Sequence, residues 1–272
     1  MGAAMARTLA GKGVAVVGYD VAEAARNAAA VPVVADLAEL WPRTRTVVLS
    51  LPLPEHVEAV MASLLAAHAP PTLVIDTSTS DPDVTVRLGQ ALDAQGHALV
   101  DAPVSGGPAG AAAGTLAIMV GGSEQAVSAA RPTLDHLAAK IAHVGPLGAG
   151  HTAKLVNNVL CAAHILLAGE ALRMGAAAGT PIPALTDALN GSSGRSGVTE
   201  VNVPRWITSA TFDSGFTMAL MAKDLSLAAR LADRTGLALP LIDHVVRRWQ
   251  ELTQVHGGDA DFNRAFLGEE KG

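Results

Sequence analysis

The chain has 272 residues, of which 50% are hydrophobic and only 16% are charged. This composition excludes an intrinsically disordered chain, and the length predicts one large or two ordinary domains. A formal net charge of −6 and an aromatic content of 3% argue against nucleic-acid binding, which usually requires a basic face and stacking rings. The single cysteine, Cys161, allows no internal disulfide bond, so we expect a cytoplasmic protein.

The apolar composition raises the question of a membrane span, which requires about 18–20 uninterrupted apolar residues. The longest apolar runs, at 155–168 and 171–178, fall short of this length. The polar residues that interrupt or border them are Asn157, Asn158, His164 and Glu170. The first ten residues carry Arg7 and do not resemble a signal peptide. We therefore expect no membrane association.

In the first half of the chain, short runs rich in β-branched residues alternate with stretches rich in alanine and leucine. Strands are predicted at residues 14–19, 32–34, 45–49, 73–75, 98–100, 116–120 and 141–144. Helices are predicted at 36–40, 56–68, 81–95 and 123–139, the last with Ser123 as its N-cap, and a loop at 105–110. Strands that alternate with helices and are apolar on both faces indicate a parallel sheet with helices on both sides.

After residue 147 no strand pattern recurs. Helices are predicted there at residues 155–179, 182–190, 218–236 and 239–256. We therefore predict an α/β domain over residues 1–147 and an all-helical domain over residues 148–272.

The N-terminus carries part of a dinucleotide-binding pattern. In doubly wound folds a glycine-rich turn brings the pyrophosphate to a helix N-terminus, and an acid ending the second strand binds the ribose 2′-OH. Asp20 lies 18 residues after Gly2, the spacing expected if Gly2 is the third glycine of G-x-G-x-x-G. The first strand and first two glycines would then lie upstream of Met1. Alone, these residues fit an ordinary N-terminal helix followed by a strand equally well.

Four other segments form a more specific pattern. Their sequences are M-G-x-x-M-A-x-x-L at 1–9, D-A-P-V-S-G-G at 101–107, G-A-G-H-T-A-K-L-V-N-N at 148–158 and K-D-L at 223–225. In order and spacing they resemble the 3-hydroxyisobutyrate dehydrogenase family of β-hydroxyacid dehydrogenases, over essentially the whole chain. The resemblance implies a Rossmann-like, doubly wound N-terminal domain that binds a dinucleotide. An all-α domain for substrate binding and oligomerisation would follow it.

The N-terminus is the one departure from the family pattern. Family members begin with a strand of the type V-x-x-I-G-L-G, which is central in the strand order 3-2-1-4-5-6. Without it, backbone groups in the sheet interior would lack partners. We expect either a start assigned at an internal methionine or a truncated, inactive product, and we favour the first.

The resemblance also assigns roles to individual residues. Lys154 would be the acid/base that takes the alcohol proton as hydride leaves, and Asn158, four residues further along the same helix face, would hold the substrate. Ser105, Gly106 and Gly107 would bind the substrate carboxylate through a hydroxyl and backbone N–H groups. Without the resemblance, the lysine would be an ordinary interdomain lysine and the glycines a surface turn.

For the cofactor, the resemblance implies contacts from Gly2, Asp20, Leu51, Pro52, His56, Thr79 and Lys223. The Asp20 carboxylate would accept hydrogen bonds from a ribose 2′-OH and repel a 2′-phosphate, so we predict NAD in preference to NADP. Arg26 would weaken this inference if it folded back toward Asp20. Taken alone, His56 would be a surface residue and Thr79 a helix cap.

We therefore expect an NAD-dependent dehydrogenase of a small β-hydroxy acid such as 3-hydroxyisobutyrate, assembled as a homodimer or homotetramer. Tartronate semialdehyde and succinic semialdehyde/glyoxylate reductases remain open alternatives. Lys154 argues against the family's imine reductases, and 6-phosphogluconate dehydrogenases are longer chains. A non-catalytic nucleotide-binding homologue is a further alternative, but it has no use for Lys154 and Asn158. The nine histidines lack metal-site spacing, and we expect His151 only to line the cleft.

Overall fold

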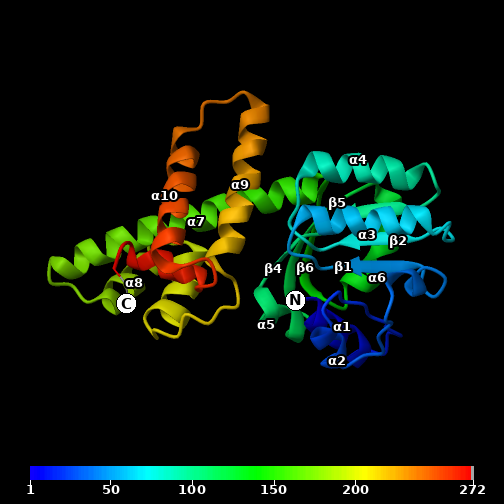
Figure 1. Cartoon of the computed structure of the whole chain (residues 1–272). Helices are drawn as coiled ribbons and strands as arrows, with labels where there is room; N and C mark the ends of the chain where they lie inside the picture. The colour runs from blue at the N-terminus through cyan, green and yellow to red at the C-terminus, as the bar shows by residue number, and fades with distance from the viewer. Residues whose placement is uncertain (271–272) are drawn as a thin grey trace. The chain divides into compact units, whose positions relative to one another are not determined.

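The computed structural model describes residues 1–270, which fold as two compact units (Figure 1). The first unit is Met1–Lys154 and the second begins at Leu155. The first unit combines a sheet with helices, and the second contains helices and irregular segments but no named strand within the described residues. The predicted fold class, an α/β domain followed by a helical domain, is confirmed.

The sheet of the first unit has the strand order β1-β2-β3-β5-β4, with β6 paired to β5. Its strands are β1 Thr46–Leu49, β2 Leu73–Asp76, β3 Ala98–Asp101, β4 Val104–Ser105, β5 Leu116–Gly121 and β6 Ala138–Gly145. The predicted parallel pairing holds for β1, β2 and β3 and for β5 with β6. Where β5 meets β3 and β4, the pairing is antiparallel.

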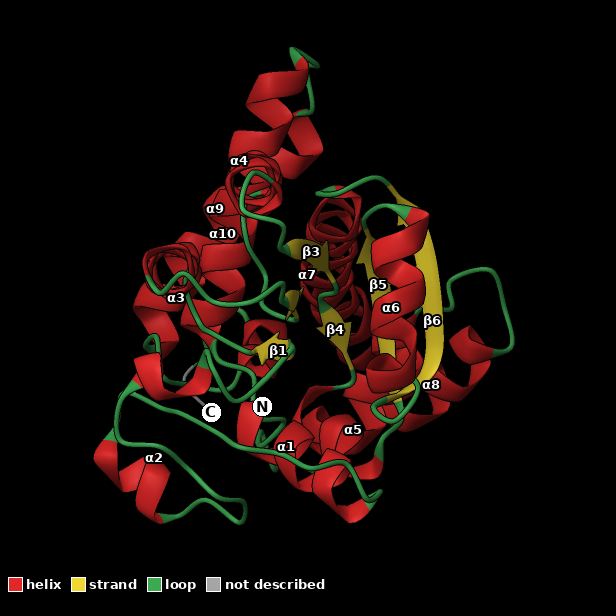
Figure 2. Cartoon of the chain, turned by 90° about the vertical axis from the view of Figure 1, so that its right-hand side faces the viewer, coloured by secondary structure: helices red, strands yellow, loops and turns green. Residues whose placement is uncertain are grey.

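Alternating side chains explain why helices cover both faces of the sheet (Figure 2). On β2 and β3, Val74 and Leu99 join the core under helices α3 (Pro54–Ala66) and α4 (Pro82–Asp93), whereas Ile75 and Val100 join the core under α6 (Glu124–Leu134). Because neighbouring residues of a strand point to opposite faces, two adjacent apolar residues require an apolar cover on each side. The helices are α1 Gly2–Gly11, α2 Glu23–Asn27, η1 Leu37–Leu40, α3 Pro54–Ala66, α4 Pro82–Asp93, α5 Gly107–Ala113 and α6 Glu124–Leu134.

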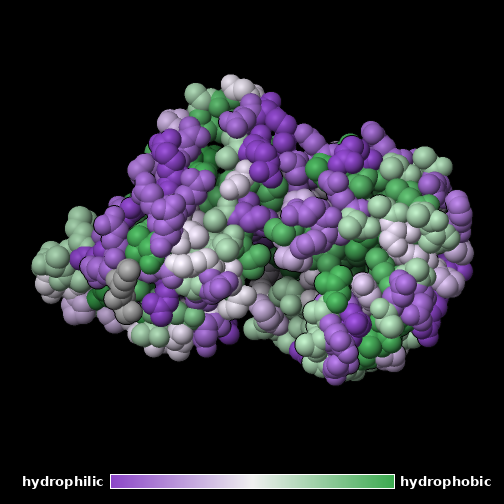
Figure 3. Space-filling model, viewed as in Figure 1, coloured by the Kyte–Doolittle hydropathy of each residue, from purple (hydrophilic) through white to green (hydrophobic). Residues whose placement is uncertain are grey.

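The second unit packs around the long helix α7. Its helical elements are α7 Ala149–Ala177, α8 Ile182–Asn190, η2 Val198–Ile207, α9 Met218–Thr235, α10 Pro240–His256 and η3 Phe262–Leu267. By length and composition alone α7 could cross a membrane, but core helices of soluble proteins can have the same length and composition. Leu155, Ile165 and Leu172 of α7 are buried in a core shared with Trp249 of α10. The outer surface over α10 is hydrophilic (Figure 3).

Several predicted elements differ from the structure. Residues 14–19 form no strand, and Gly18 makes only one bridge to Val33, so the predicted strands at 14–19 and 32–34 are wrong. A β-branched run becomes a strand only where a neighbour supplies hydrogen-bond partners. The predicted loop at 105–110 is wrong, because β4 ends and α5 begins there.

Helix α6 begins, as predicted, with the Ser123 hydroxyl accepting the Ala126 N–H, but it ends at Leu134 rather than at residue 139. The following residues, Ala138–Gly145, form β6. The predicted helix 182–190 is confirmed as α8, whereas η2 and η3 were not predicted. η2 contains Pro204, which removes a backbone donor and obscures a helical pattern.

The close packing of α7 against η3 leads to a stability prediction. A methyl group at Gly169 would lie 2.4 Å from the Phe266 carbonyl oxygen, a backbone atom that cannot rotate away. We expect Gly169→Ala to lower the free energy of unfolding by about 1–3 kcal/mol in urea titrations followed by circular dichroism. Gly197→Ala is the control, because Gly197 has α-helical dihedral angles and no atom within 4 Å of the new methyl group. Equal stability of the two variants would contradict the packing argument.

Candidate active site

The carboxyl ends of the parallel strands form the edge near which Gly2, Leu51, Pro52 and Thr79 lie. In the register of the sheet Leu49 lies beside Asp76, and Asp76 lies beside Asp101, so β1, β2 and β3 end at one level. In open α/β sheets, ligands bind outside this edge.

The N-terminus of α1 lies at the same edge. A methyl group at Gly2 would lie 3.5 Å from Cβ of Ser50, the residue after β1. Met5 Sδ lies 3.7 Å from the Thr77 hydroxyl beyond β2. No side chain caps the start of α1, where backbone N–H groups suit an anion. These residues fit the pyrophosphate of a dinucleotide.

Three predicted cofactor residues, Leu51, Pro52 and Thr79, lie in the loops that follow β1 and β2. The Leu51 N–H donates to Ser78 Oγ at 3.0 Å, which ties the loop after β1 to the loop after β2. Thr79 follows Ser78 and is half-buried, and Pro52 follows Leu51 and is exposed. The structure therefore brings Gly2, Leu51 and the Thr79 loop together.

Asp20 and His56 lie in exposed positions. Asp20 Oδ1 accepts the Ala22 N–H, and Arg26 Nη1 donates to the carbonyl oxygens of Asp20 and Val21 at 2.6 and 3.0 Å. Arg26 does fold back onto the Asp20 loop, where it donates to carbonyl oxygens. His56 lies in the first turn of α3.

The predicted carboxylate-binding residues occupy the sharp connection from β4 to α5. Ser105 ends β4, Gly107 begins α5, and Gly106 between them has a φ of 122°. A methyl group at Gly106 would also lie 3.3 Å from Leu116 Cδ2, a tight contact that Leu116 would have to relieve. The glycines are thus explained by backbone geometry, and their proposed contact with substrate stays a prediction.

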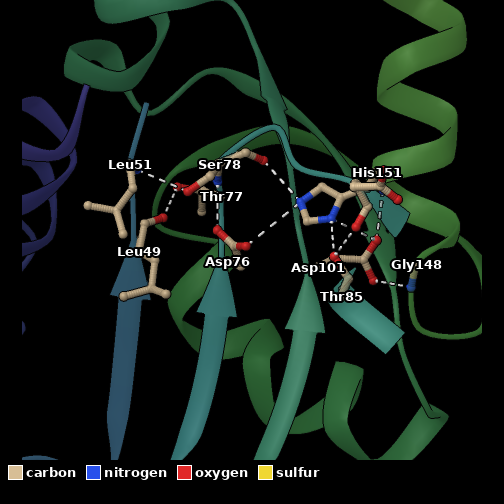
Figure 4. Close-up of polar contacts among 10 residues, drawn as sticks. Leu49, Leu51, Asp76, Thr77, Ser78, Thr85, Asp101, Gly148 and His151 are labelled. Atoms are coloured by element: carbon tan, nitrogen blue, oxygen red, sulfur yellow. Dashed lines mark hydrogen bonds and ion pairs between the residues drawn. The ribbon is translucent and has the colours of Figure 1, made fainter. Parts of the chain in front are cut away.

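The first turn of α7, which precedes Lys154, is fixed by a buried polar network (Figure 4). We call it the strand-edge network and define it as Asp76, Ser78, Thr85, Asp101 and His151. Asp101 Oδ1 accepts the N–H of Gly148 at 2.8 Å, and its Oδ2 accepts the backbone N–H of His151 at 2.7 Å. Asp101 and His151 are both 0% exposed. Lys154, three residues after His151, is half-buried.

The His151 ring connects this helix start with the loop after β2. Its Nε2 lies 3.1 Å from the Ser78 carbonyl oxygen, which can only accept, so this nitrogen donates. Its Nδ1 lies 2.8 Å from the Thr85 hydroxyl. The carboxyl oxygens of Asp76 and Asp101 lie 3.9 Å from Nε2 and Nδ1, respectively. Two acids, which end adjacent strands, thus flank one imidazole.

The second unit holds two other predicted residues together through a third. Asn158, which is 4% exposed, donates from Nδ2 to Asp224 Oδ2 at 2.6 Å. Lys223 Nζ lies 2.8 Å from Asp224 Oδ1. Asn157 donates from its amide to Asn158 Oδ1 at 3.0 Å, so it contacts Asn158 directly. Both ends of the Asn158 amide are therefore held in one orientation.

The sequence did not predict the structural roles of Asp101 and Asp224, or that His151 connects the start of α7 with the loop after β2. The available signals were the acids that end β2 and β3, the glycines before Lys154, and the acid within K-D-L. The partners lie far apart in the sequence, by 50 residues for Asp101 and His151 and by 66 for Asn158 and Asp224, so no local pattern reveals the contacts.

Comparisons with known proteins agree with this architecture. Residues 1–145 match the family model described as the NAD binding domain of 6-phosphogluconate dehydrogenase. Residues 148–266 match the one described as NAD-binding of NADP-dependent 3-hydroxyisobutyrate dehydrogenase. The two matches together cover both units.

Individual relatives are similar over most of their length. A probable 3-hydroxyisobutyrate dehydrogenase of Mycobacterium bovis is 36% identical, over 97% of this chain and 92% of the relative. An NAD-dependent L-serine dehydrogenase of Pseudomonas aeruginosa is 37% identical, over 80% of this chain and 76% of the relative. The solved structure of Mycobacterium tuberculosis 3-hydroxyisobutyrate dehydrogenase with L-serine superposes with a TM-score of 0.90, at 36% identity, over 98% of this chain and 94% of that one.

The fold, the strand edge and these matches define an NAD(P)-dependent oxidoreductase that acts on CH–OH groups. The chain belongs to the 3-hydroxyisobutyrate dehydrogenase family of β-hydroxyacid dehydrogenases. The resemblance seen in its four sequence motifs is therefore confirmed.

The Asn158–Asp224 contact leads to a second stability prediction. Asp224→Asn leaves one amide oxygen to accept from both Asn158 and Lys223, so we expect the free energy of unfolding to fall by about 1–3 kcal/mol. Urea titration measures it, with Asp187→Asn on the exposed face of α8 as control. A loss no larger than that of the control would show that the buried contact adds nothing to stability.

Proposed function

We propose that the chain is an NAD-dependent dehydrogenase of a small β-hydroxy acid, with Lys154 as its acid/base and 3-hydroxyisobutyrate as the first substrate to test. The observation that carries this proposal is the placement of Lys154 early in α7, four residues before Asn158 on one helix face. The anchored helix start gives a proton carrier a defined position, which a mobile surface lysine lacks.

The residues of this chain supply binding and proton transfer. A bound nicotinamide dinucleotide supplies hydride transfer. Lys154 would accept the proton of the substrate hydroxyl during oxidation and return it during reduction. Asn158, whose amide is oriented by Asp224 and Asn157, would hold the substrate.

The carboxylate of the substrate would lie against the turn from β4 to α5. There the Ser105 hydroxyl and the backbone N–H groups of Gly106 and Gly107 would bind it.

L-Serine is the second candidate substrate. It differs from 3-hydroxyisobutyrate at one carbon, where an amino group replaces a methyl group. The observation in its favour is that one relative is named an L-serine dehydrogenase and a solved relative contains L-serine. Tartronate semialdehyde and succinic semialdehyde or glyoxylate are the candidates in the reductive direction.

NAD is proposed over NADP because Asp20 would accept from a ribose 2′-OH. Against this preference, Arg26 folds back onto the Asp20 loop, where its Nη1 donates to the carbonyl oxygens of Asp20 and Val21. We further propose a cytoplasmic homodimer or homotetramer, with the domain boundary at residues 147/148.

Removal of the proposed acid/base tests the chemistry. We expect Lys154→Ala to lower kcat for β-hydroxy acid oxidation by roughly 10²–10⁴-fold, because no other group would take the hydroxyl proton. NADH formation measures the rate, and fluorescence titration should show unchanged NADH binding. Lys140→Ala, at an exposed position of strand β6, is the matched control. An unchanged kcat would remove Lys154 from the mechanism, and a wild-type chain that oxidises none of these acids would refute the enzyme proposal.

The cofactor preference depends on one carboxylate. We expect Asp20→Ser to reduce the ratio of kcat/KM for NAD over NADP by roughly tenfold or more, since a hydrogen bond to a charged group is lost. Glu23→Gln, which removes an exposed acid three residues away, should leave the ratio unchanged. If both variants keep the wild-type ratio, Asp20 does not select the cofactor.

A further inference from the structure

The strand-edge network contains a buried carboxyl group to which the mechanism above gives no role. Asp101 ends β3, is fully buried, and directs both carboxyl oxygens at backbone N–H groups where α7 begins. These groups belong to Gly148 and His151, so one side chain holds the residues on either side of the helix start.

We propose that Asp101 is a positioning residue for Lys154. It fixes the first turn of α7 and thereby the position of the Lys154 amine. This inference rests on the proposed function, in which Lys154 is the acid/base. The carboxyl group would contact neither substrate nor cofactor and would act only through the helix.

The anchor works because the first N–H groups of a helix have no partner within the helix. A carboxylate accepts stronger hydrogen bonds from these N–H groups than a neutral acceptor does, and its negative charge also suits the positive end of the helix dipole. With both oxygens used, Asp101 fixes both the distance and the rotation of the turn relative to β3. A hydroxyl or amide offers fewer acceptor positions in this geometry.

Two glycines show how little freedom this contact leaves. A methyl group at Gly121, the partner of Asp101 in β5, would lie 2.4 Å from Asp101 Oδ1 and 2.7 Å from the Gly150 nitrogen. A methyl group at Gly150 would lie 2.6 Å from the backbone oxygens of Asp101 and Met119. The second glycine of the G-A-G segment is therefore explained by contact between the helix start and the sheet.

The distance from anchor to amine is short. Lys154 follows His151 by three residues, which is about 4.5 Å along the helix axis and nearly one turn. A shift of the first turn would therefore move the lysine backbone by a similar amount. Misplacement of a reacting group by about 1 Å can cost about 10²-fold in rate.

The same network reaches the loops assigned to the cofactor. The His151 ring bonds to the Ser78 carbonyl, and Ser78 Oγ accepts the Leu51 N–H. The start of α7 and the loops after β1 and β2 are thus held by one set of hydrogen bonds, so Lys154 is positioned relative to the cofactor edge of its own unit.

A double-mutant cycle between Asp101 and Lys154 tests the proposal. Asp101→Asn keeps the volume but turns an NH2 group toward one of the two backbone N–H groups. We expect it to lower kcat by about 10–100-fold, with the NADH dissociation constant changed by less than about threefold. In the Lys154→Ala background the same substitution should lower kcat by less than about threefold, since the positioned group is already gone.

Asp261→Asn is the matched control. Asp261 is also buried and accepts backbone N–H groups, from Ser214 and Asn263, but it contacts no residue of the strand-edge network. Asp261→Asn should change kcat by the same factor in the wild-type and Lys154→Ala backgrounds. If Asp101→Asn also has the same effect in both backgrounds, the proposal is overturned, because equal effects indicate general destabilisation. Should Asp101→Asn not fold, Asp101→Ser, with a single acceptor oxygen, carries the same expectation.

A second measurement needs no turnover. Competitive acetylation with acetic anhydride, read by mass spectrometry, should show Lys154 labelling raised by about threefold or more in Asp101→Asn relative to Lys140. Asp261→Asn should leave this ratio unchanged, and an unchanged ratio in Asp101→Asn would refute the positioning role. If the wild type oxidises no β-hydroxy acid, the proposed function fails, whereas the labelling still decides whether Asp101 positions the lysine.

Discussion

The contact on which the geometry of the candidate site depends joins the end of a buried strand to the start of the longest helix. Asp101 accepts two backbone N–H groups there, at 2.7 and 2.8 Å, in a place without solvent. A buried carboxyl group is tolerated only where hydrogen bonds replace its hydration. The same bonds that make its burial possible also determine where α7 begins, and hence where Lys154 and Asn158 lie along it.

The sheet creates this place through its strand register. Parallel pairing aligns Leu49, Asp76 and Asp101, and the apolar residues before them are buried on both faces. Hydrophobic burial therefore stabilises the strands, while their polar ends remain available at one edge. The Asp101 carboxyl group, the Thr85 hydroxyl group and the His151 imidazole meet at that edge because they lie at the end of β3 and in the first turns of α4 and α7.

The parts of this structure that follow from local pattern were predictable from sequence. Strands β1 to β3 were predicted to within one residue at each end, because short apolar runs between turn residues have few other solutions. Residues 14–19 show the opposite case, since strand formation there depends on a partner that composition does not reveal. In the site, motifs identified Lys154 and Asn158, but Asp101 and Asp224 act across 50 and 66 residues, beyond any local pattern.

Helix α7 is a single element of 29 residues, and the border between the two units falls inside it, between Lys154 and Leu155. The acid/base candidate and the first core residue of the helical unit are thus neighbours in one turn. An exchange of helical domains between relatives at this border would cut that turn. Chimaeras that keep the turn around Lys154 intact therefore need their junction upstream, in the Gly145–Gly148 connection, so that α7 comes whole from one parent.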